Sequence, residues 1–193
     1  ITKNEVAAAF IFAPDVDLSK SLAMLPLCGV GLQNALGALA PPEVAVQLEW
    51  QGQIRINAAK CGYLQMAASG RDPDQIPDWL VVGFTLPLWF ELDDPGRTPD
   101  QTSLYEEGCA EINTVQLIES WSRHSLVWIN SWEQDGAAPL HREWRGMVYN
   151  MGEDITFAEA RGKFVGVDED FGLLLRTDET TTLHPLSDLL KDI

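Results

Sequence analysis

Residues 79–90, WLVVGFTLPLWF, constrain the fold more than any other stretch of the chain. Apolar side chains occupy both the odd and the even positions, so a strand formed here has two apolar faces. A strand with two apolar faces belongs in the interior of a sheet. We therefore predict a long central strand over 79–90.

The segment ahead of this strand predicts a further strand and a long helix. Residues 7–14, AAAFIFAP, form a short apolar run that ends at a proline, as a buried strand does. Asp17 is a suitable N-cap for the helix, Pro26 is expected to kink it or to mark a new start, and Pro41 ends it. The leucines of this helix recur at intervals of three and four residues, which places them on one face: Leu18, Leu22, Leu25, Leu32, Leu36 and Leu39.

A hairpin and a second helix flank the central strand. Residues 44–50 alternate apolar and polar side chains and predict a strand. QIRIN and KCGYLQMAA read as the two arms of a hairpin that turns near Asn57. A helix over 109–134 is predicted from the spacing of its apolar residues and ends at Gly136. Its tryptophans, Trp121, Trp128 and Trp132, are interpreted as packing the helix against the sheet.

The sequence pattern changes after residues 135–141, DGAAPLH, which we interpret as a linker. Short apolar segments then alternate with turn signals, as in a small β-barrel. VDEDFG lacks the full ligand pattern of a calcium loop and is interpreted as a turn. We predict an α+β domain over residues 1–140 and a small β domain over residues 141–193.

Charge and cysteine usage exclude several classes of function. The net charge is −16 and no Lys/Arg run occurs, which disfavours nucleic acid and acidic membrane surfaces as partners. No uninterrupted apolar run reaches the roughly 18 residues of a membrane span, and the start ITKNEV carries no signal-peptide pattern. Three widely spaced cysteines indicate a reduced, cytoplasmic setting, and neither cysteines nor histidines have metal-ligand spacing.

The order of these elements resembles the biotin–protein ligases and the related lipoate–protein ligases. VAVQLEWQGQIRINAAKCGYLQ is similar to their signature, which has the form K-W-P-N-D, a strand, a turn and K-x-x-G-I-L. LVVGFTLPL is similar to the G-x-G-x-N strand that follows. WRGMVYNMGEDITF and GKFVGVDEDFGLLL resemble the SH3-like C-terminal domain of biotin ligases. The resemblance implies a mixed, mainly antiparallel sheet with flanking helices, followed by an SH3-like domain.

The resemblance also implies a chemistry in two steps. A carboxylic acid such as biotin reacts with ATP, with Mg²⁺, to give an acyl-adenylate, and a lysine of an acceptor protein then takes the acyl group. Lys60 falls on the lysine that binds the carboxylate and the adenylate. Gly62 and Gly83 fall on glycines that line the ligand, and Trp50 falls on the signature tryptophan. Gln53 stands where the signature has its aspartate and is expected to contact the ligand.

The signature is altered in ways that bear on activity. Its first lysine is Glu49, and its Pro-Asn-Asp is Gln51, Gly52 and Gln53. A carboxylate beside a phosphate opposes binding by roughly 1–4 kcal/mol at contact. The Arg-rich loop of biotin ligases would lie upstream of residue 1. We therefore expect ordinary biotin–protein ligation to be absent or very weak, with no certain cofactor, and with ATP and Mg²⁺ needed if the chain is a ligase.

Alternatives stay open for single residues and for the whole chain. Lys60 is either a ligand residue or a solvated lysine beside a hairpin turn, and Arg55 is interpreted as part of a solvated face. Cys109 is the best candidate nucleophile, and Glu106 and Glu107 do not share a face. The chain is either an enzyme that handles a small carboxylic acid or its adenylate, or a non-catalytic binding or interaction module on the same fold.

Overall fold

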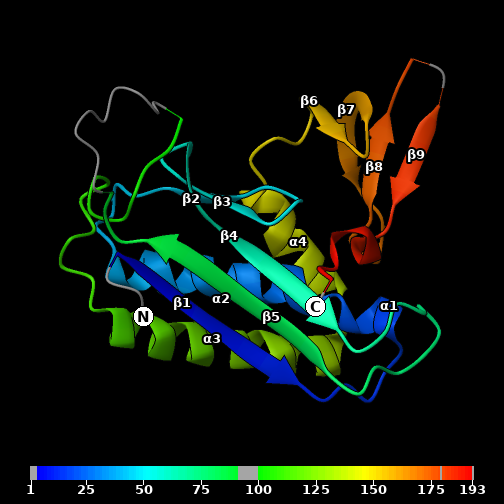
Figure 1. Ribbon diagram of the computed structural model, residues 1–193, viewed down its shortest axis with the longest axis horizontal. Helices are drawn as coiled ribbons and strands as arrows, with labels where there is room; N and C mark the ends of the chain where they lie inside the picture. Colours follow the sequence, from blue (N-terminus) through cyan, green and yellow to red (C-terminus); the bar gives the residue numbers. More distant parts are fainter. Residues whose placement is uncertain (1–3, 91–99, 179, 193) are drawn as a thin grey trace.

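The computed structural model describes residues 4–90, 100–178 and 180–192, and two antiparallel sheets dominate it (Figure 1). The larger sheet has the strand order β1-β5-β4-β3-β2. Its strands are β1 (Glu5–Phe12), β2 (Val46–Leu48), β3 (Gln53–Ile56), β4 (Ala59–Ala68) and β5 (Leu80–Pro87). The helices are α1 (Leu18–Ser21), α2 (Met24–Leu39), α3 (Thr114–Asp135) and α4 (Ala138–Met147).

The predicted central strand is β5, which pairs with β1 on one side and with β4 on the other. The strand ends at Pro87, since proline has no N–H to continue the ladder. Its two faces are covered unequally. Leu80, Val82, Phe84 and Leu86 are buried, whereas the residues between them are half-buried. One face of the large sheet is therefore packed against helices, and the other is partly open.

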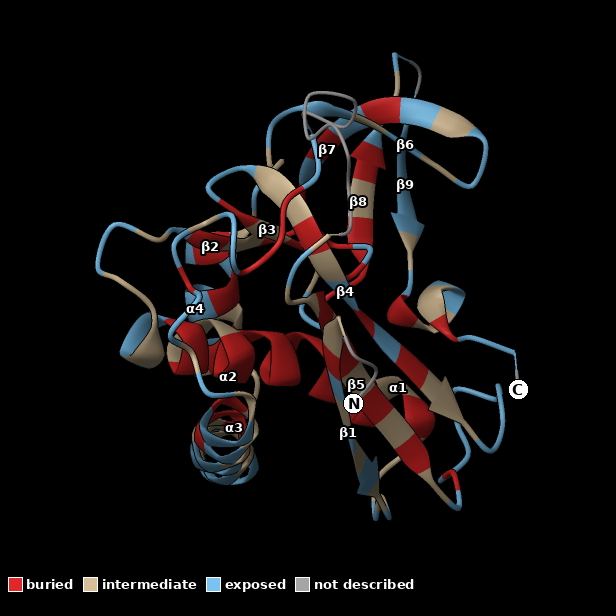
Figure 2. Cartoon of the chain, turned by 60° about the vertical axis from the view of Figure 1, so that its left-hand side comes forward, coloured by how far each residue is buried: buried red, intermediate tan, exposed pale blue. Residues whose placement is uncertain are grey.

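Helix α2 covers the packed face and forms the centre of the core, as Figure 2 shows by its buried residues. Pro26 marks a new start, because it lies in the first turn of α2, where its missing N–H leaves no helical hydrogen bond unmade. Asp17 precedes the short α1 but makes no capping hydrogen bond with its side chain. A Cβ at Gly31 would lie 2.4 Å from the Ser125 Oγ, so glycine allows α2 and α3 to pack closely.

The segment Leu18–Leu39 is long and apolar enough to cross a membrane by length and composition, with a mean hydropathy of 1.5. Isolated polar residues interrupt the apolar runs of this segment. In the folded chain 72% of the most apolar window is buried inside the protein. This burial is typical of a core helix.

Helix α3 begins at Thr114, five residues later than predicted from the apolar spacing. The Asn113 side chain accepts hydrogen bonds from the amides of Val115 and Gln116 and fixes this start. The end at Gly136 is confirmed, with a φ of 75°. Trp121 stacks on Phe10 of β1 at 4.0 Å between ring centroids, which confirms the packing against the sheet for this tryptophan. The indole N–H of Trp128 instead donates to Asn34 of α2 at 2.9 Å.

The expected linker at 135–141 is instead the end of α3 and the first turn of α4. Pro139 sits in that first turn, where proline suits a helix start. Helix α4 packs against α2 and α3, and the chain then forms the second sheet, of order β6-β7-β8-β9. Its elements are β6 (Asp154–Phe157), β7 (Ala160–Val167), β8 (Leu173–Arg176), β9 (Thr181–His184) and the 3-10 turn η2 (Leu186–Leu189). The α+β fold with a small C-terminal β domain is confirmed.

Candidate functional site

The partly open face of the large sheet carries two adjoining cavities. Among the described elements, no α-helix covers this face (Figure 1). The first, here called the apolar cavity, has a volume of about 420 Å³ and lies over β1, β5 and β4, between alanines, Val81 and Gly83. The second, here called the polar cavity, has about 510 Å³ and lies beside Glu49, Gln53 and Lys60. Both cavities touch the same part of β4, so together they form one cleft.

The β3–β4 hairpin places Lys60 in this cleft. Asn57 and Ala58 have φ of 48° and 71°, which makes the two-residue turn that suits a twisted hairpin. Lys60 is paired with Arg55 across the hairpin, and its backbone N–H donates to the Asp100 carbonyl at 2.9 Å. The Lys60 Nζ lies 3.4 Å from the Asp100 Oδ2, and its side chain is 40% exposed. Lys60 thus lines a cavity and is neither buried nor fully solvated.

Gly62 is required by the backbone geometry of β4. Its φ of +122° disfavours any side chain, and a Cβ there would lie 2.2 Å from the Thr85 carbonyl oxygen. Glycine therefore lets β4 approach β5. The family pattern has two residues between its lysine and glycine, whereas only Cys61 separates Lys60 from Gly62. Aligned on Gly62, the pattern places its lysine at Ala59, yet it is Lys60 that lines the polar cavity.

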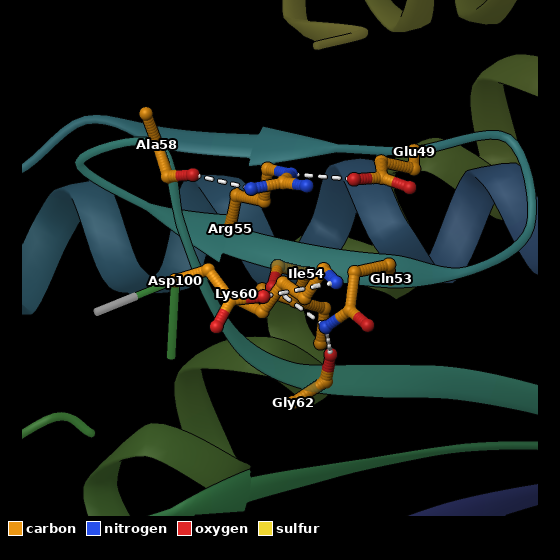
Figure 3. A network of polar contacts seen from close by, with 8 residues as sticks. All are labelled: Glu49, Gln53, Ile54, Arg55, Ala58, Lys60, Gly62 and Asp100. Atoms are coloured by element: carbon orange, nitrogen blue, oxygen red, sulfur yellow. Dashed lines mark hydrogen bonds and ion pairs between the residues drawn. The ribbon is translucent and has the colours of Figure 1, made fainter. Parts of the chain in front are cut away.

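Gln53 lines the polar cavity, but its amide group already has partners (Figure 3). The Gln53 Nε2 donates to the carbonyl of Gly62 on β4 and to the carbonyl of Ile54 at 3.2 Å. These bonds lie where the β3–β4 register shifts. Gln53 thus stabilises an irregular part of the hairpin beside the cleft, and Gly83 lines the apolar cavity.

Arg55 does not belong to a solvated face, which corrects the interpretation from alternation. Its Nε donates to the Glu49 Oε1 at 2.5 Å, and the two side chains are only 14% and 16% exposed (Figure 3). Its guanidinium also donates to the Ala58 carbonyl and lies 4.2 Å from the centre of the Tyr149 ring. The charge reversal at Glu49 is therefore compensated by Arg55.

Trp50 lies between β2 and β3 and faces the C-terminal domain. It is 3% exposed, and its indole N–H donates to the Phe171 carbonyl at 2.7 Å. Its ring meets Phe157 edge-on at 5.0 Å between centroids. Gln51 donates to the Thr156 carbonyl at 3.2 Å. The altered signature thus supplies contacts that hold the two domains together, and Trp50 does not join Lys60 in lining the cavities.

The other candidates from the sequence have ordinary structural surroundings. Cys109 is 3% exposed, and burial raises the pKa of its thiol, which opposes a role as a nucleophile. Glu107 accepts hydrogen bonds from Asn57 and Thr102, whereas Glu106 accepts from Ser103, so the two carboxylates are directed to different partners. VDEDFG is a turn, in which the Asp168 carboxylate accepts from the Gly172 amide at 2.7 Å.

The cleft does not fit Mg²⁺ well. Glu49 is bound by Arg55, and the amide of Gln53 is bound to two carbonyls. Across residues 4–90, 100–178 and 180–192, no three His, Cys, Asp or Glu side chains are grouped as metal ligands would be. Mg²⁺ prefers several oxygen ligands in octahedral geometry, including carboxylates. The described lining of the cleft does not offer such a set of ligands.

The cleft also contains residues that the sequence reasoning missed. Tyr63 and Gln65 follow Lys60 on the open face of β4, and Lys191 reaches the same place from the far end of the chain. Alternation along β4 could have identified Tyr63 and Gln65, because Leu64 between them is buried. Nothing in the sequence pattern indicates that Lys191 lies beside them.

Comparison with known proteins places this architecture in a family. Residues 1–146 match the model of the biotin/lipoate A/B protein ligase family. This chain belongs to that family. Residues 151–192 match the model of a domain of unknown function. A search of curated proteins found no significant match.

Solved structures support the same assignment. A biotin protein ligase-like protein of unknown function from Silicibacter sp. TM1040 is 56% identical, with a TM-score of 0.93 over 100% of this chain and 83% of that chain. Biotin protein ligase from Aquifex aeolicus, solved with biotin and ATP, is 17% identical, with a TM-score of 0.73 over 93% of this chain and 75% of that chain. The Leishmania major ligase with biotinyl-5-AMP is 15% identical, with a TM-score of 0.58 over 95% of this chain and 78% of that chain. The two ligases share the fold of this chain.

Proposed function

We propose that the cleft binds a small carboxylic acid, or the acyl-adenylate formed from it, with the Lys60 ammonium at the anionic end of the ligand. The observation that carries this proposal is the position of Lys60 in a polar cavity that adjoins an apolar one. An acid with an apolar body needs both environments, because its body gains from burial and its carboxylate needs a cation. The neighbouring Asp100 is 62% exposed, so a bound anion can compete with it for Lys60.

The charge of the whole chain makes a local cation necessary. With a net charge of −16, the protein repels anions at long range. A carboxylate therefore binds only where fixed positive charge outweighs this repulsion at short range. The compensation of Glu49 by Arg55 helps here, because a paired Glu49 opposes an anion in the cleft less than an unpaired one.

Two versions of this proposal differ in chemistry. In the first, the chain is a ligase: the carboxylate attacks the α-phosphorus of ATP and pyrophosphate leaves. The amine of an acceptor lysine then attacks the acyl carbon, AMP leaves, and the amine loses a proton to solvent. The relatives crystallised with biotin and ATP or with biotinyl-5-AMP favour this version. In the second version, the chain binds the acid or adenylate without activating it, and the use of Trp50 and Gln51 in domain contacts favours this version.

Equilibrium binding of octanoate, lipoate, biotin and non-hydrolysable adenylate analogues, measured by calorimetry, tests the shared part of the proposal. Lys60→Met is expected to weaken binding of the best acid about tenfold, as for the loss of one charged contact. Lys20→Met removes one positive charge from the exposed side of α1 and serves as the matched control. If the unmodified protein binds none of these compounds, the proposal fails.

Exchange of labelled pyrophosphate into ATP separates the two versions. Exchange that depends on both the acid and Lys60 supports the ligase. Acid binding without exchange supports the binding module. We expect biotin-dependent exchange to be absent or very weak, because the signature residues that would face phosphate and metal are replaced here by Glu49, Gln51 and Gln53.

A further inference from the structure

Residues Leu190–Asp192, here called the return segment, come back from the C-terminal domain and run beside β4. Leu190 forms a parallel bridge with Met66, and the Lys191 N–H donates to the Met66 carbonyl at 3.0 Å. On the other side, an Nη of Arg71 donates to the Leu190 carbonyl at 3.2 Å and pairs with Asp192. The return segment is therefore held by backbone pairing and by a clamp from the loop between β4 and β5.

This docking places Lys191 at the boundary between the two cavities. Lys191 lines both of them, whereas Lys60 lines only the polar one. On the apolar side the lining includes the small side chains of Ala67 and Val81. On the polar side the return segment adjoins Asp188. Among the described residues, no ion pair or side-chain hydrogen bond involves Lys191.

We propose that Lys191 is a second cation for the carboxylate of an acid whose apolar body lies in the apolar cavity, and that it binds this carboxylate together with Lys60. This assignment rests on the proposed function of the cleft. A carboxylate at the end of an apolar body lies where the apolar lining stops, and Lys191 supplies the cation at that boundary. Lys60 stands farther along, among the polar residues.

The proposal makes Arg71 a positioning residue. Arg71 is not among the residues that line either cavity, but its contacts with Leu190 and Asp192 hold the return segment on β4. Without that clamp, Lys191 would occupy the boundary for a smaller fraction of the time. Arg71→Gln should therefore weaken acid binding in the same direction as Lys191→Met, but by less.

The test compares an acid with its uncharged carboxamide. The acid is whichever of octanoate, lipoate and biotin binds the unmodified protein most tightly, and the carboxamide keeps the same apolar body without the charge. Lys191→Met is expected to lower the affinity for the acid about tenfold and to change the affinity for the carboxamide less than about twofold. Lys20→Met controls for the loss of one positive charge.

Each outcome decides a separate point. A loss restricted to the acid supports the proposal. Equal losses for acid and carboxamide mean that Lys191 only shapes the wall, which overturns it. If Lys191→Met behaves like Lys20→Met while Lys60→Met weakens binding, the role of Lys191 is overturned and the proposed function stands. If no acid binds the unmodified protein, both fall together.

Discussion

Replacing Trp50 by phenylalanine should loosen the junction between the two domains. The indole N–H of Trp50 is the hydrogen-bond donor to the Phe171 carbonyl, at 2.7 Å. Both residues are nearly inaccessible, with Trp50 3% and Phe171 1% exposed. Phenylalanine keeps an aromatic ring at this position but has no donor, so the Phe171 carbonyl would be left buried and unpaired.

The expected loss of stability follows from two contributions. A buried carbonyl without a partner costs about 1–3 kcal/mol. The smaller ring also leaves a cavity beside Phe157, which costs about 1 kcal/mol. We therefore expect Trp50→Phe to lower the free energy of unfolding by about 2–4 kcal/mol. For a chain of this size, that corresponds to a decrease in Tm of roughly 5–15 °C.

Urea unfolding followed by far-ultraviolet circular dichroism measures this loss. Trp89→Phe is the matched control, because Trp89 is 38% exposed. Limited proteolysis adds a local measurement, since a loosened junction should be cleaved faster between α4 and β6. If Trp50→Phe loses no more than about 0.5 kcal/mol, or no more than the control, then the Phe171 carbonyl finds water when the indole is absent and the junction does not depend on Trp50.

Three further predictions concern the hairpin and the core. Arg55→Ala should lower the free energy of unfolding by about 2–3 kcal/mol, because it leaves the Glu49 carboxylate largely buried without a partner, and adding Glu49→Ala should restore part of that loss in a double-mutant cycle. Gly62→Ala should cost more than about 2 kcal/mol, whereas Gly37→Ala, which meets open space in α2, should stabilise by about 0.5–1 kcal/mol in the same urea assay. Burial raises the pKa of Cys61 from 9.0 to about 12. The folded state therefore holds the thiol proton more tightly than the unfolded state does. The resulting contribution to the free energy of unfolding is complete below pH 9 and is lost as the pH rises toward 12. The urea midpoint should therefore fall less between pH 8 and pH 10.5 in Cys61→Ala than in the unmodified protein. An equal fall in both proteins would contradict a raised pKa of the Cys61 thiol.

Local patterns were sufficient for most elements of the fold. Alternation predicted the β3–β4 hairpin and its turn at Asn57, and the two-faced apolar run predicted the interior position of β5. The predicted start of α3 was wrong because apolar spacing defines only the buried face of a helix. The first turn is set by the side chain of Asn113. The prediction of a linker at 135–141 was wrong because Gly136 ends one helix and the next begins within two residues.

The site was less predictable because its contacts join distant parts of the chain. Lys60 could be placed beside the turn by its own hairpin, although the family pattern aligned on Gly62 points to Ala59. The partner of Trp50 stands 121 residues away, and Lys191 reaches β4 only through the path of the whole C-terminal domain. Arg55 and Glu49 are close in sequence, but alternation alone treats both as solvated. The cytoplasmic setting and the role of each site residue stay predictions.

The bridge between Met66 and Leu190 has a consequence for synthesis of the protein. A ribosome makes the hairpin that carries Lys60 early, and the large sheet can begin to fold while later residues are still being added. The wall of the cleft that contains Lys191 cannot form until residue 190 has left the exit tunnel. A nascent chain stalled before that point would therefore hold a folded sheet with an unfinished cleft.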